Sequence, residues 1–300
     1  MIRMAEMEQG MIRKALSGFY YVRTESGQLL ECRAKGIFRK EGITPLVGDQ
    51  VEVENGVVAK ILPRKNQILR PPAANIDRAV LVVSADKPQP NTLILDKLIA
   101  VCESKEIEPL LVFTKTDLAD CAELQEIYRQ AGFQVFTSQP SQTDYSGLLR
   151  EMAGRLNVFI GNSGVGKSTL MNVLIPDLGL ATAQISDKLG RGRHTTRHVE
   201  LYELAGGGLV ADTPGFSTVE IEKYGHILKE ELPECFREFR KYLGGCQFQN
   251  CSHRKEKGCA VLAAVNEGKI SRSRHESYQA LYEDAMQIRE WELREGDKHN

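Results

Sequence analysis

The sequence predicts an α/β protein of three parts, and three observations support this prediction. Five short strand-like segments separated by turns crowd into residues 13–70. From residue 71 onward the pattern changes to apolar strands alternating with helices, as in doubly wound sheets. Three cysteines and a histidine then gather near the C-terminus. We expect a flexible N-terminus at 1–12, a β-barrel at 13–70, a doubly wound domain at 71–220 and a helical metal-binding module at 221–300.

The composition is that of an ordinary globular protein, with 42% hydrophobic and 26% charged residues. The net charge of −1 means that any basic surface must be local. No apolar run approaches the ~20 residues that span a bilayer, and the N-terminus is polar. We therefore expect a cytoplasmic monomer that does not bind membranes. Four isolated cysteines are expected to be ordinary thiols: Cys32, Cys102, Cys121 and Cys235.

The candidate barrel strands are 19–22, 29–32, 36–38, 50–53 and 57–61. Five short strands in this length fit a small barrel of the OB type, although a generic β domain that binds nothing is the alternative. Residues 13–70 hold eleven Lys/Arg against six Asp/Glu. With Tyr20, Tyr21 and Phe38, this local excess favours RNA binding by backbone attraction and base stacking. A merely solvated charged face is the other interpretation.

The doubly wound domain is predicted from the apolar run 79–83, which is typical of a strand buried on both faces. The further expected strands are 109–113, 134–136, 157–160 and 208–211, and the expected helices are 91–103, 118–131 and 146–154. A last charged helix is expected at 276–295. Its apolar face holds Tyr278, Leu281, Tyr282, Ala285 and Ile288.

Residues 161–168 read GNSGVGKS, the phosphate-loop pattern G-x-x-x-x-G-K-[ST], between an expected strand and an expected helix. The glycines let backbone N–H groups surround a phosphate, and the helix presents its positive end to it. Lys167 would reach the outer phosphates and Ser168 would bind Mg²⁺. The predicted triphosphate-binding residues are Gly161, Asn162, Ser163, Gly164, Val165, Gly166, Lys167, Ser168 and Thr169.

A second nucleotide motif, DTPG at 212–215, follows the expected strand 208–211. It predicts Asp212 on the metal side and Gly215 at the γ-phosphate. The basic, glycine-rich segment 188–198 between the two motifs suits a loop that becomes ordered around a triphosphate. Either Thr195 or Thr196 would complete the Mg²⁺ shell. A loop that contacts RNA and has no metal role is the alternative.

The sequence TKTD at 114–117 predicts guanine as the base. One carboxylate, Asp117, can accept both the N1–H and the exocyclic amine of guanine, whereas the N1 acceptor of adenine would be repelled. The Lys115 stem would cover the ring. Thr114 stands where the usual N-K-x-D motif has asparagine, which removes an amide contact. Ser138, after strand 134–136, is placed for a backbone contact to the base.

These motifs occur in the order base, phosphate loop, basic loop, metal aspartate, which is a circular permutation of the ordinary GTPase order. With GRHTTRH at 192–198, they make the chain resemble the ribosome small-subunit-dependent GTPase A family (the RsgA or YjeQ type) over nearly its whole length. The resemblance implies a GTP hydrolase stimulated by the small (30S) ribosomal subunit. It also implies a factor that binds rRNA late in subunit maturation and leaves on hydrolysis. Thr114 and Gln139 are small departures that bear on base affinity.

Many GTPases orient the attacking water with a glutamine just after D-x-x-G, but this chain has Phe216 there. We therefore expect slow intrinsic hydrolysis and a missing group supplied by another loop or by a partner. His194 is the candidate, together with Lys167, and the resemblance points the same way. His194 as a loop cap or an RNA contact is the alternative. Two rivals for the whole chain are a regulatory GTP-binding module with negligible turnover and a small-molecule kinase, which the base motif disfavours.

The cysteine cluster reads C-x₄-C-x-H-x₅-C, with Cys246, Cys251, His253 and Cys259. Three thiolates and an imidazole suit tetrahedral Zn²⁺, and four protein ligands leave no open position for a substrate water. The pattern therefore predicts one structural zinc ion. Four unlinked buried side chains are the alternative.

Overall fold

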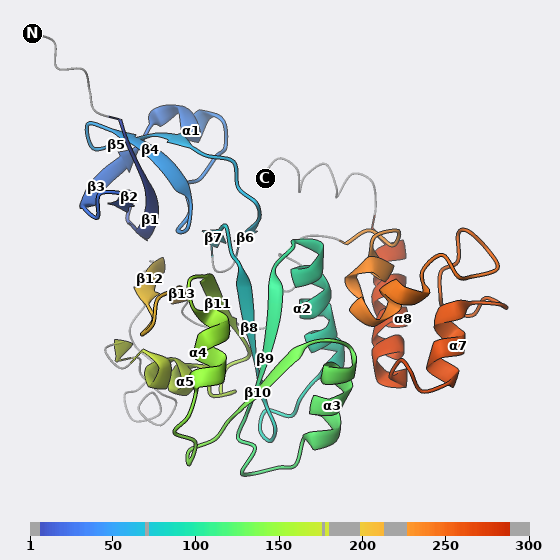
Figure 1. The fold of residues 1–300 in the computed structure, drawn as a ribbon. Coiled ribbons are helices and arrows are strands. Elements are labelled where there is room, and N and C mark those ends of the chain that lie inside the picture. Colours follow the sequence, from blue (N-terminus) through green and yellow to red (C-terminus); the bar gives the residue numbers. More distant parts are fainter. Residues whose placement is uncertain (1–6, 70–71, 176–177, 180–198, 213–226, 289–300) are drawn as a thin grey trace, which may run out of the picture.

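The structure, a computed structural model, describes residues 7–69, 72–175, 178–179, 199–212 and 227–288. Figure 1 shows a β-barrel, a central sheet flanked by helices and a helical C-terminal region on the far side of α2 (Thr92–Ser104). In the described part of the chain, no helix is both long and apolar enough to cross a membrane.

The barrel confirms the OB-type prediction. Its five strands are β1 (Glu8–Leu16), β2 (Phe19–Thr24), β3 (Leu29–Ala34), β4 (Gln50–Glu54) and β5 (Val57–Ile61). They are ordered β1-β2-β3-β5-β4, and β4 returns to pair with β1, which closes the barrel. The alternating residues of these strands point inward, and Ile12, Val22, Val51 and Val58 are fully buried.

Two details of the barrel differ from the sequence prediction. The strand β1 already begins at Glu8, so residues 8–12 belong to the barrel and not to a flexible N-terminus. The expected strand at 36–38 is instead the first part of the short helix α1 (Gly36–Lys40). Its two apolar residues are too few to show a period: Phe38 is buried, while Ile37 is 48% exposed. Successive side chains of a helix point in directions about 100° apart, so one can be buried and the next exposed, as in a strand.

The central sheet is parallel, with strand order β10-β9-β8-β11-β13. Its strands are β8 (Arg78–Ser84), β9 (Glu108–Thr114), β10 (Gln134–Ser138), β11 (Leu156–Ile160) and β13 (Leu209–Asp212). The other helices among the described residues of this domain are α3 (Ala122–Gln130), α4 (Ser146–Met152) and α5 (Lys167–Leu174). Each lies near its expected range, so the alternation of strands and helices was predicted correctly.

The sheet is doubly wound, with helices on both of its faces, and successive residues of β8 point into different cores. Ala79 and Leu81 of β8 pack with α2 and α3 in one cluster. Val80 and Val82 of the same strand pack with α4 and α5 in another. Both faces of the sheet are therefore covered, which explains the continuous apolar run that marked β8 in the sequence.

The barrel and the central sheet are joined edge to edge by a strand that the sequence did not reveal. β12 (Val199–Glu203) pairs antiparallel with β13 on one side and with β1 on the other. The result is one continuous sheet of eleven strands. A small hairpin of β6 (Gln67–Leu69) and β7 (Pro72–Ala74) links the two domains along the chain.

The C-terminal region consists of two 3₁₀ helices and two α-helices around an aromatic core. Within the described residues 227–288 they are η3 (Leu232–Cys235), η4 (Arg237–Tyr242), α7 (Ala260–Asn266) and α8 (Arg272–Met286). Phe236, Phe239 and Tyr278 are fully buried and their rings are in contact. Of the expected apolar face of the last helix, Tyr278 and Leu281 are buried and the others are partly buried. This region therefore forms a core of its own.

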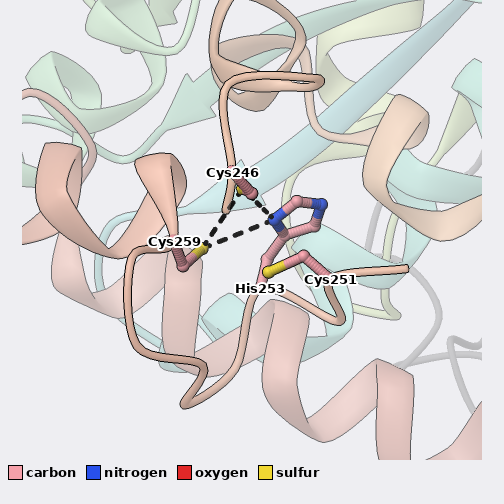
Figure 2. Close-up of side chains that lie close together, drawn as sticks. All are labelled: Cys246, Cys251, His253 and Cys259. Carbon is pink, nitrogen blue, oxygen red and sulfur yellow. Dashed lines mark hydrogen bonds between the residues drawn. The ribbon is translucent and has the colours of Figure 1, made fainter. Parts of the chain in front are cut away.

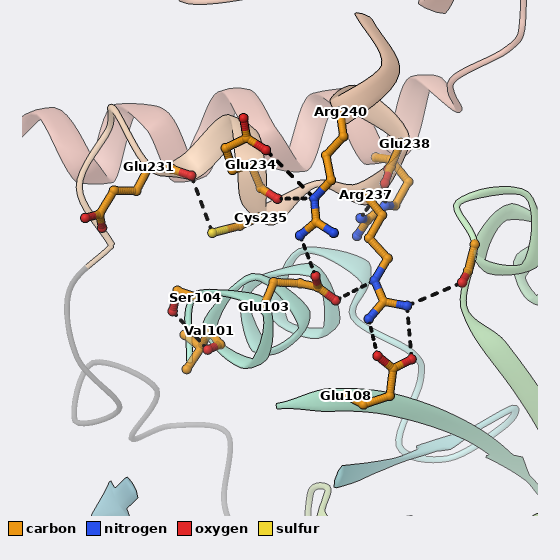
Figure 3. A network of polar contacts seen from close by, with 12 residues as sticks. Val101, Glu103, Ser104, Glu108, Glu231, Glu234, Cys235, Arg237, Glu238 and Arg240 are labelled. Carbon is orange, nitrogen blue, oxygen red and sulfur yellow. Dashed lines mark hydrogen bonds and ion pairs between the residues drawn. The ribbon is translucent and has the colours of Figure 1, made fainter. Parts of the chain in front are cut away.

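Arginines fasten this region to the central domain. Arg274 of α8 is 1% exposed; its guanidinium donates to Asp96 of α2 and, at 2.7 Å, to Glu238 of η4. Closer to the surface, Arg237 binds both Glu103 and Glu108, and Figure 3 shows the paired bonds to Glu108. The buried Arg274 takes one carboxylate from each domain, Asp96 and Glu238, so this contact ties the C-terminal region to the central domain.

Candidate functional site

The predicted nucleotide residues gather at the carboxyl edge of the parallel sheet. Ser84, Thr114 and Ser138 end β8, β9 and β10 in matching register. Ile160 ends β11 and leads into the glycine loop, while Asp212 is the last residue of β13. Segments from residue 114 to residue 212 therefore meet at one edge despite their permuted order (Figure 1). Crevices at this edge are where doubly wound sheets bind ligands.

The phosphate loop has the backbone conformation that its glycines were expected to allow. Gly164 and Gly166 adopt positive φ angles of 79° and 93°. A Cβ on Gly161 would lie 2.6 Å from the Val82 carbonyl oxygen, so a side chain there would collide with β8. Lys167 begins α5, and its Nζ lies 3.3 Å from the Gly161 carbonyl oxygen, across the loop. The loop thus has the form of a phosphate cradle at a helix N-terminus.

The base motif contacts the phosphate loop directly. The Thr114 hydroxyl donates to the Val165 carbonyl. The Lys115 ammonium donates to the Gly164 carbonyl at 2.8 Å and to the Lys87 carbonyl. The two predicted motifs therefore lie side by side, although their contacting residues are 51 and 49 positions apart in the chain. From the sequence, Thr114 is expected only to remove an amide contact to the base.

Asp117 is exposed at the end of this motif, where a base edge would be accessible. Ser138 is buried, and its carbonyl accepts from the Lys115 backbone N–H at 3.1 Å. The Ser138 hydroxyl lies 2.9 Å from the hydroxyl of Tyr145, which is also buried. The two base-reading segments are thus fixed to each other and to Tyr145. Tyr145 has no signature in the sequence, because its role depends only on the fold.

Several predicted site residues lie outside the described residues: His194, Thr195, Thr196, Gly215 and the rest of segment 188–198. Asp212 is described as the last residue of β13, without its side chain. Its place at the same edge as the phosphate loop is nevertheless given by the parallel pairing of β11 and β13.

The structure brings together all four predicted metal ligands. One ligand atom from each of Cys246, Cys251, His253 and Cys259 lies within 4.8 Å of the others (Figure 2). The His253 Nδ1 is 3.5 Å from the sulfurs of both Cys246 and Cys259, which are 3.8 Å apart. Ligands at tetrahedral zinc distances of about 2.3 Å for sulfur and about 2.05 Å for nitrogen would be about 3.8 Å and about 3.6 Å apart. The donor set and the three separations among Cys246, His253 and Cys259 therefore fit a tetrahedral metal ion.

The protonation of these groups would change when a cation binds. Burial lowers the pKa of the His253 imidazole, which favours its neutral, ligating form. Burial together with the neighbouring thiols raises the pKa of Cys251 to about 12. Thiolates this close together would repel one another, and a cation among them would stabilise the charged forms.

The loop that carries His253 is held by Glu256 and by α8. The Glu256 carboxylate accepts from the backbone N–H groups of Ser252 and Arg254 at 2.8 and 3.0 Å. Desolvation would raise the pKa of Glu256, but hydrogen bonds from the Ser252 hydroxyl and from the backbone N–H groups of Lys255, Glu256 and Ser252 outweigh it and lower the pKa to about 2. From α8, His275 contacts the His253 carbonyl oxygen at 2.8 Å, and Tyr278 donates to the Ser252 carbonyl. Glu256 was missed from the sequence, although it lies inside the metal-ligand spacing.

A five-stranded barrel, a phosphate loop with a base motif at one sheet edge, and the permuted order of the motifs define a circularly permuted P-loop GTPase. Residues 61–222 match the family described as RsgA GTPase, and residues 9–57 match its N-terminal domain. The chain belongs to the RsgA GTPase family and is a GTP-hydrolysing enzyme.

Curated relatives match nearly the whole chain. A protein of Geobacillus sp. (strain WCH70) named small ribosomal subunit biogenesis GTPase RsgA is 48% identical over 290 residues. The match covers 93% of this chain and 97% of that protein. The protein of the same name from Bacillus subtilis (strain 168) is 44% identical over 288 residues, covering 91% and 95% of the two chains.

Two solved structures share the fold over the same length. YloQ, described as a circularly permuted GTPase, is 37% identical, with a TM-score of 0.76 and coverage of 95% of this chain and 97% of that one. YjeQ from Thermotoga maritima is 30% identical, with a TM-score of 0.77 and coverage of 95% and 100%. The predicted permutation of the domain is thereby confirmed.

Proposed function

We propose that this GTPase acts late in the maturation of the small (30S) ribosomal subunit. In this proposal the subunit and its rRNA stimulate GTP hydrolysis, and hydrolysis releases the protein. The curated relatives carry names that assign them to the biogenesis of this subunit. One structural observation carries the proposal for this chain: the barrel with its basic excess shares a continuous sheet with the nucleotide edge. We further propose that the protein works as a cytoplasmic monomer.

We propose that GTP lies along the carboxyl edge of the sheet. The backbone of residues 161–168, Thr169 and the Lys167 ammonium would bind its phosphates, and Asp117 would accept from the guanine edge. The Lys115 stem would cover the base, and Ser138 would contact its oxygen. The contacts of Thr114 and Lys115 with the phosphate loop support this arrangement, because they place the two motifs within reach of one nucleotide.

We propose that Ser168 and Asp212 hold the Mg²⁺ ion that accompanies GTP, with Thr195 or Thr196 completing its shell. Gly215 would contact the γ-phosphate. The Mg²⁺ ion would neutralise charge on the phosphate oxygens during transfer. Because Phe216 cannot orient a water, His194 is proposed to act on the attacking water, with Lys167 stabilising the developing charge.

The metal cluster is proposed to hold one structural Zn²⁺ ion. The donor set of three thiols and one imidazole and the tetrahedral spacing of its atoms support this choice of metal. With all four positions filled by protein, the ion would stabilise the loops of the C-terminal region and would take no part in hydrolysis.

For rRNA, we propose the exposed basic corner of the barrel near α1. Arg33, Lys35, Arg39 and Lys40 are exposed there. The Arg33 guanidinium lies 4.8 Å from the centre of the Phe19 ring, so one cationic group of this corner is held over an aromatic ring. Of the aromatic residues expected to stack on bases, Phe38 is excluded, since its side chain is 7% exposed and lies in the barrel core.

The test is the GTPase rate with and without purified small ribosomal subunits, at low and at high salt. We expect slow intrinsic turnover and strong stimulation that falls steeply as salt rises, because contacts to RNA phosphates release counterions. Large subunits serve as the control. A rate that small subunits leave unchanged would contradict the proposal and would favour a GTPase with a different activator.

The role of His194 is tested in the same assay. His194→Ala is expected to lower subunit-stimulated turnover while GTP binding stays near that of the unaltered protein. His198→Ala is a matched control from the same basic segment. A wild-type stimulated rate for His194→Ala would remove His194 from the mechanism.

A further inference from the structure

We propose that a cavity between the barrel and the central domain binds a small phosphate ester, at a place separate from the GTP site. The cavity measures about 670 Å³, which is within the range of pockets that hold small molecules. Three parts of the chain line it: strands β1 and β4 of the barrel, the linker on either side of β6 and β7, and the turns before β11 and β13. Its lining residues include none of those proposed to bind GTP.

The cavity lies at the amino edge of the parallel sheet. Leu156 and Leu209, the first residues of β11 and β13, both line it, whereas the phosphate loop follows the other end of β11. Asp77, which also lines the cavity, directly precedes β8. A molecule in this cavity and a nucleotide at the carboxyl edge would therefore lie at opposite ends of the same strands.

Glycines keep one side of the cavity open, and the turns that carry them are held in place. Gly154 and Gly207 line the cavity with φ angles of 66° and 86°, and a Cβ on either would meet no atom within 4 Å. The Leu209 N–H donates to the Arg155 carbonyl at 2.8 Å, which joins the two turns. The buried Asn157 amide donates to the carbonyls of both Arg155 and Leu209. The cavity is therefore bounded by backbone with fixed hydrogen bonds.

Each of the three parts contributes a cation to the cavity. Arg13 belongs to β1, Lys65 to the linker and Arg155 to the turn before β11. Glu203 accepts from one terminal nitrogen of Arg13, and Asp77 pairs with the Lys65 ammonium. Arg155 is exposed, and no carboxylate among the described residues forms an ion pair with it. The lining groups thus leave one cation in excess.

The two carboxylates are engaged by the protein and leave donors available. One oxygen of Asp77 binds Lys65, and the other accepts from the Leu156 N–H at 2.7 Å. A guanidinium has five N–H groups, so Arg13 keeps donors beyond its bond to Glu203. Burial lowers the pKa of Arg13, since the cation loses hydration, and Glu203 offsets this effect only in part. A second negative group beside Arg13 would therefore be favourable.

These features together specify the chemistry of the ligand. Phosphate oxygens match the donors of two guanidinium groups and an ammonium in charge and geometry. Met11 and Leu204 add apolar surface to the cavity, which suits the organic part of an ester better than a bare phosphate ion. Because Arg13 lies on the barrel and Arg155 on the central domain, one ligand would bridge the two.

The test measures binding of uridine monophosphate to the full chain by titration calorimetry. GDP is present in excess, so that the proposed guanine site is occupied. Uridine, which lacks the phosphate, is the control ligand. We expect the monophosphate to bind with a Kd below about 1 mM and uridine to bind at least about tenfold more weakly.

Substitutions of opposite expected effect identify the cavity as the site. Arg155→Gln removes the cation in excess and should weaken binding about tenfold, whereas Arg155→Lys should retain most of it. Glu203→Gln removes a negative group and should strengthen binding about threefold. Arg150→Gln, at an exposed position of α4 outside the cavity, should bind as the original protein does. Arg155 and Glu203 are exposed, so both variants are expected to fold.

Failure of uridine monophosphate to bind would overturn the proposal, as would equal losses in Arg155→Gln and Arg150→Gln. A short single-stranded oligouridylate separates a free ester from the backbone of an RNA. Binding of the oligouridylate alone, weakened by Arg155→Gln, would show that the occupant is RNA and that the assignment of a small ligand is wrong.

Discussion

Lys14 of the barrel and Glu200 of the central domain form an ion pair with a distance of 2.7 Å between Nζ and Oε2. They are also partners in the register of β1 and β12, and Glu200 is in turn the register partner of Asp212 on β13. The barrel is therefore two strands from the residue proposed to bind Mg²⁺. Strand pairing transmits displacement along a sheet, so this junction connects the proposed RNA surface to the nucleotide edge.

Reversal of the charge at this junction should weaken it. Lys14→Glu places two carboxylates opposite each other, and we expect a loss of about 1 kcal/mol in unfolding free energy, since the pair is partly solvated. The double variant Lys14→Glu/Glu200→Lys should recover most of the loss in thermal unfolding. Lys60→Glu, which breaks a more exposed pair with Glu52 in the same barrel, is the control. A double variant no better than the single one would show that the pair does not stabilise the junction.

Removal of Arg274 should destabilise the protein strongly. Arg274→Met leaves Asp96 and Glu238 buried without their cation, and such a loss costs about 3–5 kcal/mol. The loss of unfolding free energy is measured by urea denaturation. The control Arg240→Ala breaks a partly exposed pair with Glu103 and should cost no more than about 1 kcal/mol. Equal effects of the two substitutions would mean that burial of the ion pair contributes nothing.

The metal content of the purified protein tests the cysteine cluster. We expect about one zinc ion per chain by elemental analysis. Cys259→Ser should lose that ion and unfold at lower temperature, since structural zinc contributes to folding. Cys121→Ser, a buried thiol of the central domain, should retain the zinc. Full zinc content in Cys259→Ser would exclude the four-ligand site.

Glu256 should affect zinc affinity without being a ligand. Glu256→Gln weakens the acceptor of several hydrogen bonds that shape the loop around His253. Loss of such support around a metal site lowers affinity by about 10–100-fold. Competition with a chromogenic chelator measures the affinity. Glu267→Gln, whose carboxylate pairs with the exposed Lys269, is the control and should bind zinc normally. Normal affinity in Glu256→Gln would leave the loop hydrogen bonds without a role in binding.

Stability at high pH should depend on Cys102. Burial, aided by Glu103 and Glu108, raises the pKa of this thiol from 9.0 to about 12. A raised pKa in the folded state stabilises the protein below the unfolded value, and this contribution disappears as pH rises from about 9 toward about 12. The stability difference between wild type and Cys102→Ala should therefore shrink by about 1.4 kcal/mol per pH unit above 9.

The matched control is Val101→Ala, which removes a buried group of α2 that does not ionise. Its stability difference from wild type should stay constant over the same range of pH. A constant difference for Cys102→Ala as well would show that the Cys102 thiol ionises normally in the folded protein.

Much of the site was predictable because its chemistry is local in the chain. The phosphate loop and the four metal ligands each occupy a short segment, and their spacing alone restricts what they can bind. The permuted order of the motifs was equally visible, since it needs only their positions. The strands of the central domain followed from their apolar runs, whereas α1 was mistaken for a strand because two apolar residues carry no period.

Other features depended on contacts between residues that are far apart in sequence. Lys14 and Glu200 are separated by 186 positions, and Arg274 and Asp96 by 178. Nothing near any of these residues indicates its partner. The role of Tyr145 at Ser138 is of the same kind, because a tyrosine hydroxyl has no sequence signature until a fold places an acceptor beside it.

The sequence by itself determined the GTPase class, the candidate metal ligands and the barrel, because local residue types and their spacing restrict phosphate, base and metal chemistry. Only the tertiary structure decided that β12 joins barrel and nucleotide edge in one sheet, and that Arg274 fastens the C-terminal region to α2. It also directed Thr114 to the phosphate loop. These three features depend on which backbone carbonyls and buried charges come within hydrogen-bond distance. The chain brings such groups together only when it packs.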